Sequence, residues 1–244
     1  MALNVGKYDW PGIHHLWSVA IEEQFYMLWP LIIALAPLAQ LRRICGLLIV
    51  GSVACKFLLV AIHAPWTAVY VSSIGRLEGL ALGAFIATLS QAEALHWRRW
   101  IRLGGLLGIA GLLAMIATGA QLMSKLTLLW AIPAATAAFG WLLFAIHTGS
   151  LPAALKTLLS GSTLAWFGRY SYGLYLCHYA IYWCVRPLVP LWFGRDPAIA
   201  QANDVVLVTG IVALLLSMLY ARLMFALIEA PALRLRERGA QRGR

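Results

Sequence analysis

Residues 205–229 read VVLVTGIVALLLSMLYARLMFALIE, and this stretch decides the class of the fold. Before its final glutamate it contains a single charged side chain, Arg222. A helix rises about 1.5 Å per residue, so about 20 mainly apolar residues cross the hydrocarbon core of a membrane. A helix is also one of the few structures that bond all their backbone N–H and C=O groups there. The stretch is therefore predicted to be a membrane-spanning α-helix.

The rest of the chain has the same character. Of its 244 residues, 62% are hydrophobic and 11% are charged, whereas a soluble domain has about 25% charged residues. We predict one all-α domain, a polytopic transmembrane bundle of about seven helices. The predicted spans are residues 17–39, 44–62, 70–90, 103–120, 126–147, 164–190 and 205–229. The glycines of LGGLLGIAGLL (103–113) are typical of close helix packing.

The net charge of +10 follows membrane topology, so nucleic acid is not an expected partner. Basic residues concentrate in alternate connections between the spans, as on the cytoplasmic side of membrane proteins. Eleven lie on the side assigned to the cytoplasm: Arg42, Arg43, Arg98, Arg99, Arg102, Lys156, Arg234, Arg236, Arg238, Arg242 and Arg244. The other side has three, Lys7, Lys125 and Arg195. We therefore predict an outer loop at 1–16, the N-terminus outside, and a basic cytoplasmic tail at 230–244.

Ionisable side chains inside the spans are the first candidates for chemistry, because each is costly in hydrocarbon unless it is paired or faces a cavity. Counted by depth, they form an outer layer of Glu22, Glu23, Lys56, Arg76 and Glu78, and an inner layer of Arg169, Arg222 and Glu229. His178 lies near the middle of its span. We expect one of the two adjacent glutamates to pair with Arg76 or Lys56. That pair either holds helices together or lines a polar cavity.

The histidines permit more than one interpretation. His178 is either a catalytic base or a hydrogen-bonding residue between helices. His14 and His15 are interpreted as interfacial loop residues, because Ser18 and Val19 follow where an HxxxxD acyltransferase motif would need an aspartate. There is no HExxH, phosphate-binding loop or dinucleotide fingerprint, and the four cysteines lack zinc spacing, so no metal site is expected.

Four stretches, in order, resemble the acyltransferase 3 family of bacterial membrane O-acyltransferases. They are HHLWSVAIEEQFYMLWPLI (14–32), GRLEGLALGAFIA (75–87), FGRYSYGLYLCHYAI (167–181) and IEAPALR (228–234). The first is similar to the family's W-S-L-x-x-E-E-Q-F-Y, with Val19 in place of leucine. The second has Glu78 where the family commonly has aspartate. The matching residues are Trp17, Ser18, Glu22, Glu23, Gln24, Phe25, Tyr26, Arg76, Gly83, Ser171, Tyr172, Tyr175, Leu176, His178, Glu229 and Pro231.

The resemblance implies transfer of an acyl group, usually acetyl, from acyl-CoA to a hydroxyl of a surface carbohydrate or similar acceptor. It implies a multi-pass protein of the bacterial inner (plasma) membrane, in contact with membrane lipid. Acyl-CoA is a substrate, and no tightly bound cofactor is expected. Candidate catalytic residues are Glu22, Glu23, Arg76 and His178; candidate substrate-binding residues are Trp17, Ser18, Tyr26, Glu78, Ser171, Tyr172, Arg169 and Arg222. The CoA phosphates would meet Arg98, Arg99, Arg102, Arg169 and Arg222.

Family members usually carry about three further helices and a catalytic histidine ahead of the first matching stretch, and this sequence contains neither. We therefore expect residues 1–244 to be the C-terminal part of such a domain. Whether the chain is active without a separate N-terminal portion stays open at this stage. Two other functions also stay open: a transporter or flippase of a lipid-linked or glycolipid substrate, and a non-catalytic remnant or partner subunit.

Overall fold

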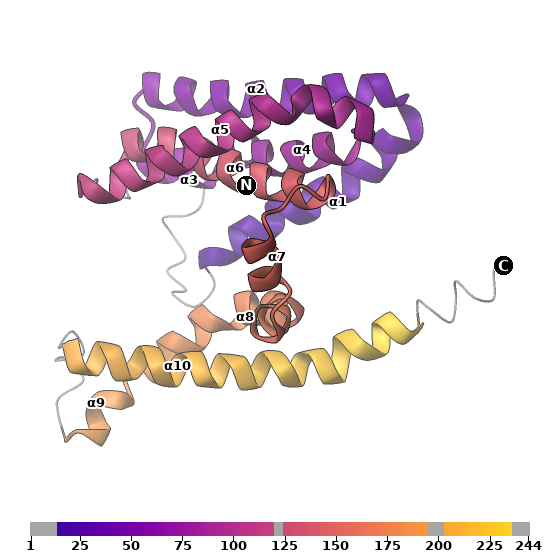
Figure 1. Cartoon of the computed structure of the whole chain (residues 1–244). Helices are drawn as coiled ribbons and strands as arrows, with labels where there is room; N and C mark the ends of the chain where they lie inside the picture. Colours follow the sequence, from indigo (N-terminus) through magenta and orange to yellow (C-terminus); the bar gives the residue numbers. More distant parts are fainter. Residues whose placement is uncertain (1–13, 120–123, 195–202, 236–244) are drawn as a thin grey trace. The chain divides into compact units, whose positions relative to one another are not determined.

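The structure, a computed structural model, describes residues 14–119, 124–194 and 203–235. These residues are almost entirely helical and include no strand, so the predicted all-α class is confirmed. The α-helices are α1 (Trp17–Leu35), α2 (Leu38–Ala61), α3 (Trp66–Val71), α4 (Ser73–Ala87), α5 (Gln91–Ala117), α6 (Lys125–His147), α7 (Ala153–Leu159), α8 (Ser162–Val185), α9 (Val189–Trp192) and α10 (Asn203–Met224). A 3-10 turn, η2 (His14–Leu16), precedes α1, and a π-helical turn, η4 (Phe225–Glu229), follows α10 (Figure 1).

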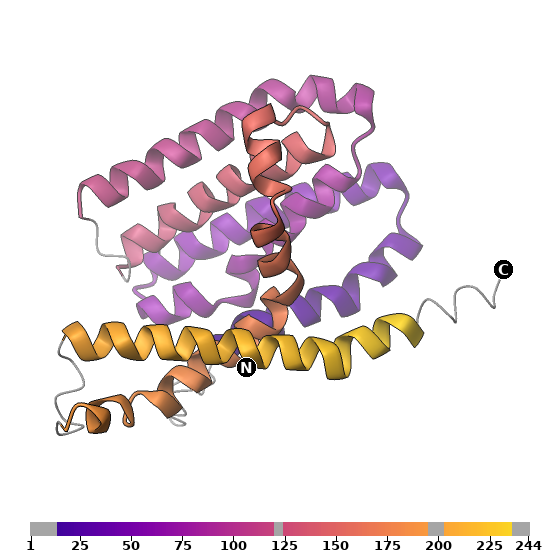
Figure 2. The same cartoon turned by 60° about the horizontal axis from the view of Figure 1, so that its bottom comes forward.

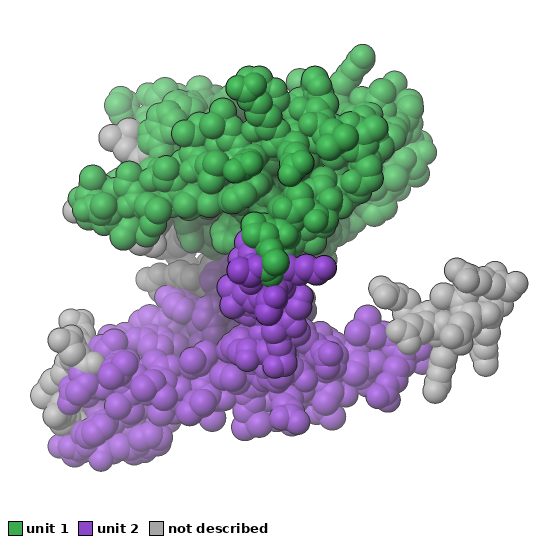
Figure 3. Space-filling view, in the orientation of Figure 1, with its two compact units in different colours: residues 1–5, 17–153 green, residues 6–16, 154–244 purple. Residues whose placement is uncertain are grey.

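The chain divides into two compact units, coloured separately in Figure 3. Unit 1 comprises residues 1–5 and 17–153, and unit 2 comprises residues 6–16 and 154–244. The interpretation of the whole chain as one domain stays a prediction.

Six helical segments of the described residues are long and apolar enough to cross a membrane: Trp17–Leu35, Leu38–Ala61, Trp66–Ala87, Gln91–Ala117, Thr127–His147 and Asp204–Leu235. The polytopic prediction is confirmed for these six. The remaining predicted span, 164–190, forms α8, which is long enough at 24 residues but is not among the six. Five tyrosines, two tryptophans, Arg169 and His178 make α8 less apolar than the others. Length and composition together thus support six of the about seven predicted spans among the described residues.

In unit 1, α5 packs along α6, α2 packs along α4, and α4 also contacts α6 (Figures 1 and 2). Glycine permits the closest of these approaches. A Cβ atom built on Gly108 would lie 2.4 Å from the Ala134 carbonyl oxygen, and one built on Gly105 would lie 2.3 Å from Trp141 Cβ. Close packing is thus confirmed for these two glycines of the 103–113 stretch. Gly104 and Gly111 face open space instead.

We expect Gly108→Ala to destabilise the protein by about 1–3 kcal/mol, the usual cost of forcing extra atoms into a packed contact. The clash is with backbone, so α5 and α6 must separate to relieve it. Unfolding of the purified protein in mixed micelles gives the measurement. Gly111→Ala is the matched control in the same helix and should be neutral or slightly stabilising. Equal effects of the two variants would contradict the account of this helix contact.

The predicted span 70–90 is not one continuous helix. It is divided at Ser72 into α3 and α4, and the Ser72 hydroxyl accepts a hydrogen bond from the Gly75 N–H at 3.1 Å. A serine side chain that satisfies an N–H group of the first turn is a common way to begin a helix. The break leaves the carbonyl groups at the end of α3 available to side chains of α4.

The helix α5 begins 12 residues before its predicted span, so Arg98, Arg99 and Arg102 lie in a helix and not in a loop. Ser90 and Glu93 form a capping box: each side chain bonds the backbone N–H of the other residue. The S-x-x-E spacing that begins this helix is visible in the sequence, although its first turns are too polar to resemble a span.

In unit 2, α8 packs against α10, and Gly173 permits the contact: a Cβ atom there would lie 3.2 Å from Ala221 Cα. After α10 the helix widens into η4, where the Ala230 N–H bonds the Phe225 carbonyl. Pro231 follows directly. Because a proline has no N–H and its ring presses on the preceding turn, the wider turn accommodates it inside a helix that continues to residue 235.

Candidate functional site

The most deeply buried charged side chains among the described residues of unit 1 are Lys56 on α2 and Glu78 on α4. Lys56 Nζ lies 2.5 Å from Glu78 Oε2, and the two side chains are 0% and 2% exposed. The Thr136 hydroxyl of α6 donates a hydrogen bond to Glu78 Oε1 at 3.4 Å. Gly75 makes room for the lysine, since a Cβ atom there would lie 3.2 Å from Lys56 Cγ. The pair thus connects α2, α4 and α6 at one level, in agreement with the similar depth predicted for Lys56 and Glu78. That this level belongs to the outer layer stays a prediction.

The sequence predicts that one of the two adjacent glutamates pairs with Arg76 or Lys56. The pairing with Lys56 is wrong, because Lys56 forms its salt bridge with Glu78. Glu22 and Glu23 are both exposed on α1, and neither forms a salt bridge with Arg76 or with any other described residue. The two salt bridges between described residues are Lys56–Glu78 and Arg42–Glu93. Counting residues correctly placed Lys56 and Glu78 at the same level, but it could not give the face of the helix on which each side chain lies.

Arg76 lies one turn from the break at Ser72 and contacts two aromatic rings. Its Nε donates a hydrogen bond to the Tyr70 carbonyl at the end of α3, at 2.9 Å. Its guanidinium carbon lies 4.7 Å from the centre of the Tyr70 ring and 5.2 Å from that of Trp17, within cation–π range. Trp17 and Tyr70 also meet edge to face. The break between α3 and α4 therefore holds this guanidinium in a defined orientation.

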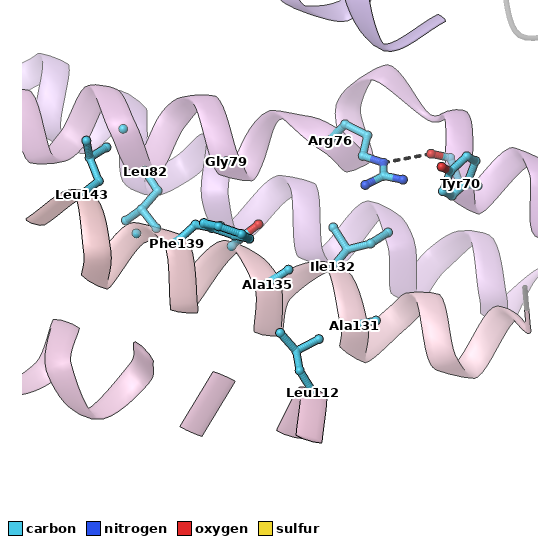
Figure 4. A pocket seen from close by; sticks show the side chains of 13 residues that line it. Tyr70, Arg76, Gly79, Leu82, Leu112, Ala131, Ile132, Ala135, Phe139 and Leu143 are labelled. Atoms are coloured by element: carbon cyan, nitrogen blue, oxygen red, sulfur yellow. Dashed lines mark hydrogen bonds between the residues drawn. The ribbon is translucent and has the colours of Figure 1, made fainter. Parts of the chain in front are cut away.

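A groove of about 530 Å³ runs between α4 and α6, with Arg76 at one end and Leu143 at the other (Figure 4). It is hollow because small residues recur at helical spacing on both walls. These are Gly79 and Gly83 on α4, and Ala131, Ala135 and Gly140 on α6. Phe139, Leu82 and Leu112 complete an apolar lining. A volume of this size is in the range of small-molecule sites.

A cluster of aromatic and imidazole rings lies in unit 2, between η2 and α8. The ring centres of His15 and His178 are 4.8 Å apart, and the His15 ring also meets Tyr175 and Tyr179. The Tyr175 hydroxyl donates to the His15 carbonyl at 2.9 Å. His15, interpreted from the sequence as a loop residue, is thus part of a cluster with the predicted catalytic candidate.

One backbone carbonyl determines which ring nitrogen of each imidazole carries a proton. The Tyr175 carbonyl oxygen lies 2.7 Å from His15 Nε2 and 2.8 Å from His178 Nδ1. A carbonyl oxygen only accepts hydrogen bonds, so each of those nitrogens must carry its proton. In a neutral imidazole the other nitrogen then has the lone pair. For His178 this nitrogen is Nε2, on an exposed side chain, and a histidine held in this way is suited to accept a proton.

The sequence model of one family, described as "Acyltransferase domain", matches residues 2–222. The chain belongs to the acyltransferase 3 family. The peptidoglycan O-acetyltransferase OatA of Listeria monocytogenes is 30% identical over 249 residues, covering 93% of this chain and 37% of the relative. The O-acetyltransferase OatA of Staphylococcus aureus is 28% identical over 240 residues, covering 90% of the chain and 36% of the relative. No solved structure matches.

The chain therefore spans little more than a third of the length of these relatives. Membership of the acyltransferase 3 family confirms the resemblance inferred from the four sequence stretches. It also agrees with the polytopic helical architecture of the described residues.

The other residues expected to form the acyltransferase site are divided between the two units. In unit 1, Ser18 is half-buried and Tyr26 is 56% exposed. In unit 2, the Ser171 hydroxyl donates to the carbonyl of Gly168 in its own helix, at 2.9 Å. Tyr172, Arg169 and Arg222 are exposed. Their roles stay predictions.

Tyr70 and His15 are the residues that sequence reasoning did not assign to a site. Tyr70 could not be identified from the sequence, because inside the continuous helix predicted for residues 70–90 its carbonyl would bond a backbone N–H group and not a side chain. His15 precedes the Trp17–Tyr26 stretch directly, and its proximity to that stretch was the available signal.

Proposed function

We propose that this chain forms part of a membrane O-acyltransferase. The enzyme moves an acyl group, in the simplest case acetyl, from acyl-CoA to a hydroxyl of a cell-surface carbohydrate. The observation that carries the proposal is the imidazole of His178, fixed with Nε2 as its basic nitrogen. Family membership supplies the reaction class. The similar proteins named as O-acetyltransferases, one of them acting on peptidoglycan, indicate the class of acceptor.

In this proposal His178 Nε2 takes the proton of the acceptor hydroxyl while the hydroxyl oxygen attacks the thioester carbonyl carbon. The carbonyl oxygen becomes negatively charged as the new C–O bond forms. When the tetrahedral species collapses, the C–S bond breaks and the imidazolium returns the proton to the CoA thiolate. The products are an O-acyl ester and free CoA. The neutral imidazole is regenerated, so no further reactant is needed.

Arg76 is proposed to bind a polar or negatively charged end group of a substrate held in the unit 1 groove. Its guanidinium is always charged, and the Tyr70 carbonyl and two aromatic rings hold its orientation. The apolar lining beyond it suits an acyl chain. We keep the predicted orientation, with the N-terminus outside and the C-terminus cytoplasmic in a bacterial inner membrane, as part of the proposal.

Expression in a bacterial host whose own wall acetyltransferase gene is deleted tests the function. Alkali releases ester-linked acetate from isolated wall glycans, and the amount can be measured by chromatography. The proposal expects ester acetate to rise above that of the empty-vector host. If ester acetate stays at the background while the intact protein accumulates in the membrane, acyl transfer to wall carbohydrate is wrong.

A second candidate function is translocation of a lipid-linked substrate, and the break between α3 and α4 is the observation that favours it. Transporters commonly build their sites from discontinuous helices. Movement of a fluorescent lipid-linked sugar across proteoliposomes containing the intact protein separates the candidates. Translocation without formation of any ester would support this second function, whereas ester formation supports the first.

We expect Arg76→Gln to lower acyl transfer at least about tenfold, because a hydrogen bond to a charged group contributes about 1.5–3 kcal/mol. Arg76→Lys should recover little of this, because an ammonium group lacks the planar fork of the guanidinium. The exposed Arg43→Gln is the control and should retain full activity. Thermal denaturation of each purified variant checks that loss of the ring contacts has not unfolded the protein. Full turnover in folded Arg76→Gln would remove Arg76 from the mechanism.

A further inference from the structure

Three arginines within five residues of α5 have no partner among the residues that the structure describes. Arg98, Arg99 and Arg102 are exposed, and their side chains form no hydrogen bond or salt bridge with a described residue. The nearest acid on the helix, Glu93, is already bonded to Arg42 and Ser90. Like charges one helical turn apart repel each other. The cluster is therefore available to bind an anion.

The arginines lie where two hollows of unit 1 meet. One, of about 520 Å³, is lined by all three arginines with Leu95, Leu103 and Leu106. The other, of about 260 Å³, lies between α5 and α6 and shares Arg98, Arg102 and Leu106 with the first. Its remaining lining is Trp141, Phe144, Ala145, Ser150 and Pro152. Arg98 and Arg102 thus form a positively charged surface, and the surface next to it along α5 is apolar.

This combination of charge and apolar wall indicates the chemistry of the ligand. Guanidinium groups bind phosphate strongly through charge-assisted hydrogen bonds. The exposed leucines beyond them would meet hydrocarbon. Trp97 and Trp100, both exposed, lie beside the arginines in the helix, as aromatic residues do at the level of lipid headgroups. The phosphates of a free nucleotide could bind the arginines, but a nucleotide has no hydrocarbon chain to cover the exposed leucines.

We propose that Arg98 and Arg102 bind the phosphate of an anionic phospholipid, with an acyl tail lying along Leu103 and Leu106. Basic pockets between membrane helices bind anionic headgroups in this way. This site shares no lining residue with the Arg76 groove or with the His178 cluster. It does not depend on the function proposed above.

Native mass spectrometry of the intact protein, purified in detergent and titrated with phosphatidylglycerol or phosphatidylcholine, tests the proposal. We expect phosphatidylglycerol to bind more tightly, and the double variant Arg98→Gln/Arg102→Gln to weaken that binding on the order of tenfold or more. The control is Arg43→Gln/Arg234→Gln, which removes the same charge from two other exposed positions and should bind normally. Arg98→Lys/Arg102→Lys should retain most of the binding.

Three results would overturn the proposal. Equal binding of the two lipids would show that the phosphatidylglycerol headgroup is not selected, and equal losses in the test and control variants would show that only total charge matters. Displacement of phosphatidylglycerol by acetyl-CoA, with acetyl-CoA binding lost in the double variant, would make this a nucleotide site. If the double variant does not fold, the lipid comparison and the acetyl-CoA competition on the unmodified protein still decide the question.

Discussion

His178→Asn is expected to lower acyl transfer about 10²- to 10⁴-fold, the usual contribution of a general base. The asparagine amide nitrogen can take the place of Nδ1 and still donate to the Tyr175 carbonyl, which His178 Nδ1 contacts at 2.8 Å. What the variant lacks is the basic Nε2 nitrogen. The rate of ester formation by the purified intact protein, with melting temperature measured on the same preparation, gives the result.

Two further variants separate catalysis from structure. His178→Gln should be as inactive as His178→Asn, since neither amide is a base. If His178 has no catalytic role, the asparagine variant should instead retain activity, because it keeps the bond to the Tyr175 carbonyl within α8. His96→Gln, at an exposed histidine of α5, is the control and should be fully active. Retained turnover in both His178 variants would exclude this residue as the base.

Lys56→Met is expected to destabilise unit 1 by about 3–5 kcal/mol, the usual cost of breaking a buried ion pair. The substitution leaves the Glu78 carboxylate 2% exposed and without its cation. Removing both charges in Lys56→Met/Glu78→Leu should recover most of the loss, since buried pairs often exchange for apolar residues at little cost. Unfolding in mixed micelles gives the free energies.

The exposed Lys156→Met is the matched control for this experiment and should change stability little. If Lys56→Met were as stable as the unmodified protein, the buried pair would not be a structural connection between α2 and α4. If the double variant were stable but inactive, while Lys156→Met was active, the pair would also belong to the acyltransferase site.

The sequence was sufficient for the helices because hydropathy alone determines which segments lipid can accept. Six of seven predicted spans are supported by length and composition, and the exception, α8, is a helix rich in tyrosine. The break at Ser72 could not be predicted from hydropathy. It depends on a hydroxyl that bonds an N–H group three residues later, a polar detail inside an apolar stretch.

The residues of the site could be predicted from the sequence, but the contacts between their side chains could not. Trp17 and Arg76 were both chosen from the sequence, and the structure brings them together. The pairing of Lys56 was wrong because depth along a helix says nothing of direction around it, and Glu78 rather than Glu22 or Glu23 faces the lysine. Contacts such as His15 with His178 join residues about 160 positions apart and depend on how η2 meets α8.

In the proposed mechanism His178 serves as the base in acyl transfer to a carbohydrate hydroxyl. This role can be measured by following acetyl-labelled acetyl-CoA in proteoliposomes containing the intact protein and a wall-derived glycan. We expect label in an alkali-labile ester on the glycan, formed at least about 10²-fold faster by the unmodified protein than by folded His178→Asn. Ester formation at the same rate by both proteins, or no ester above protein-free liposomes, would contradict this mechanism.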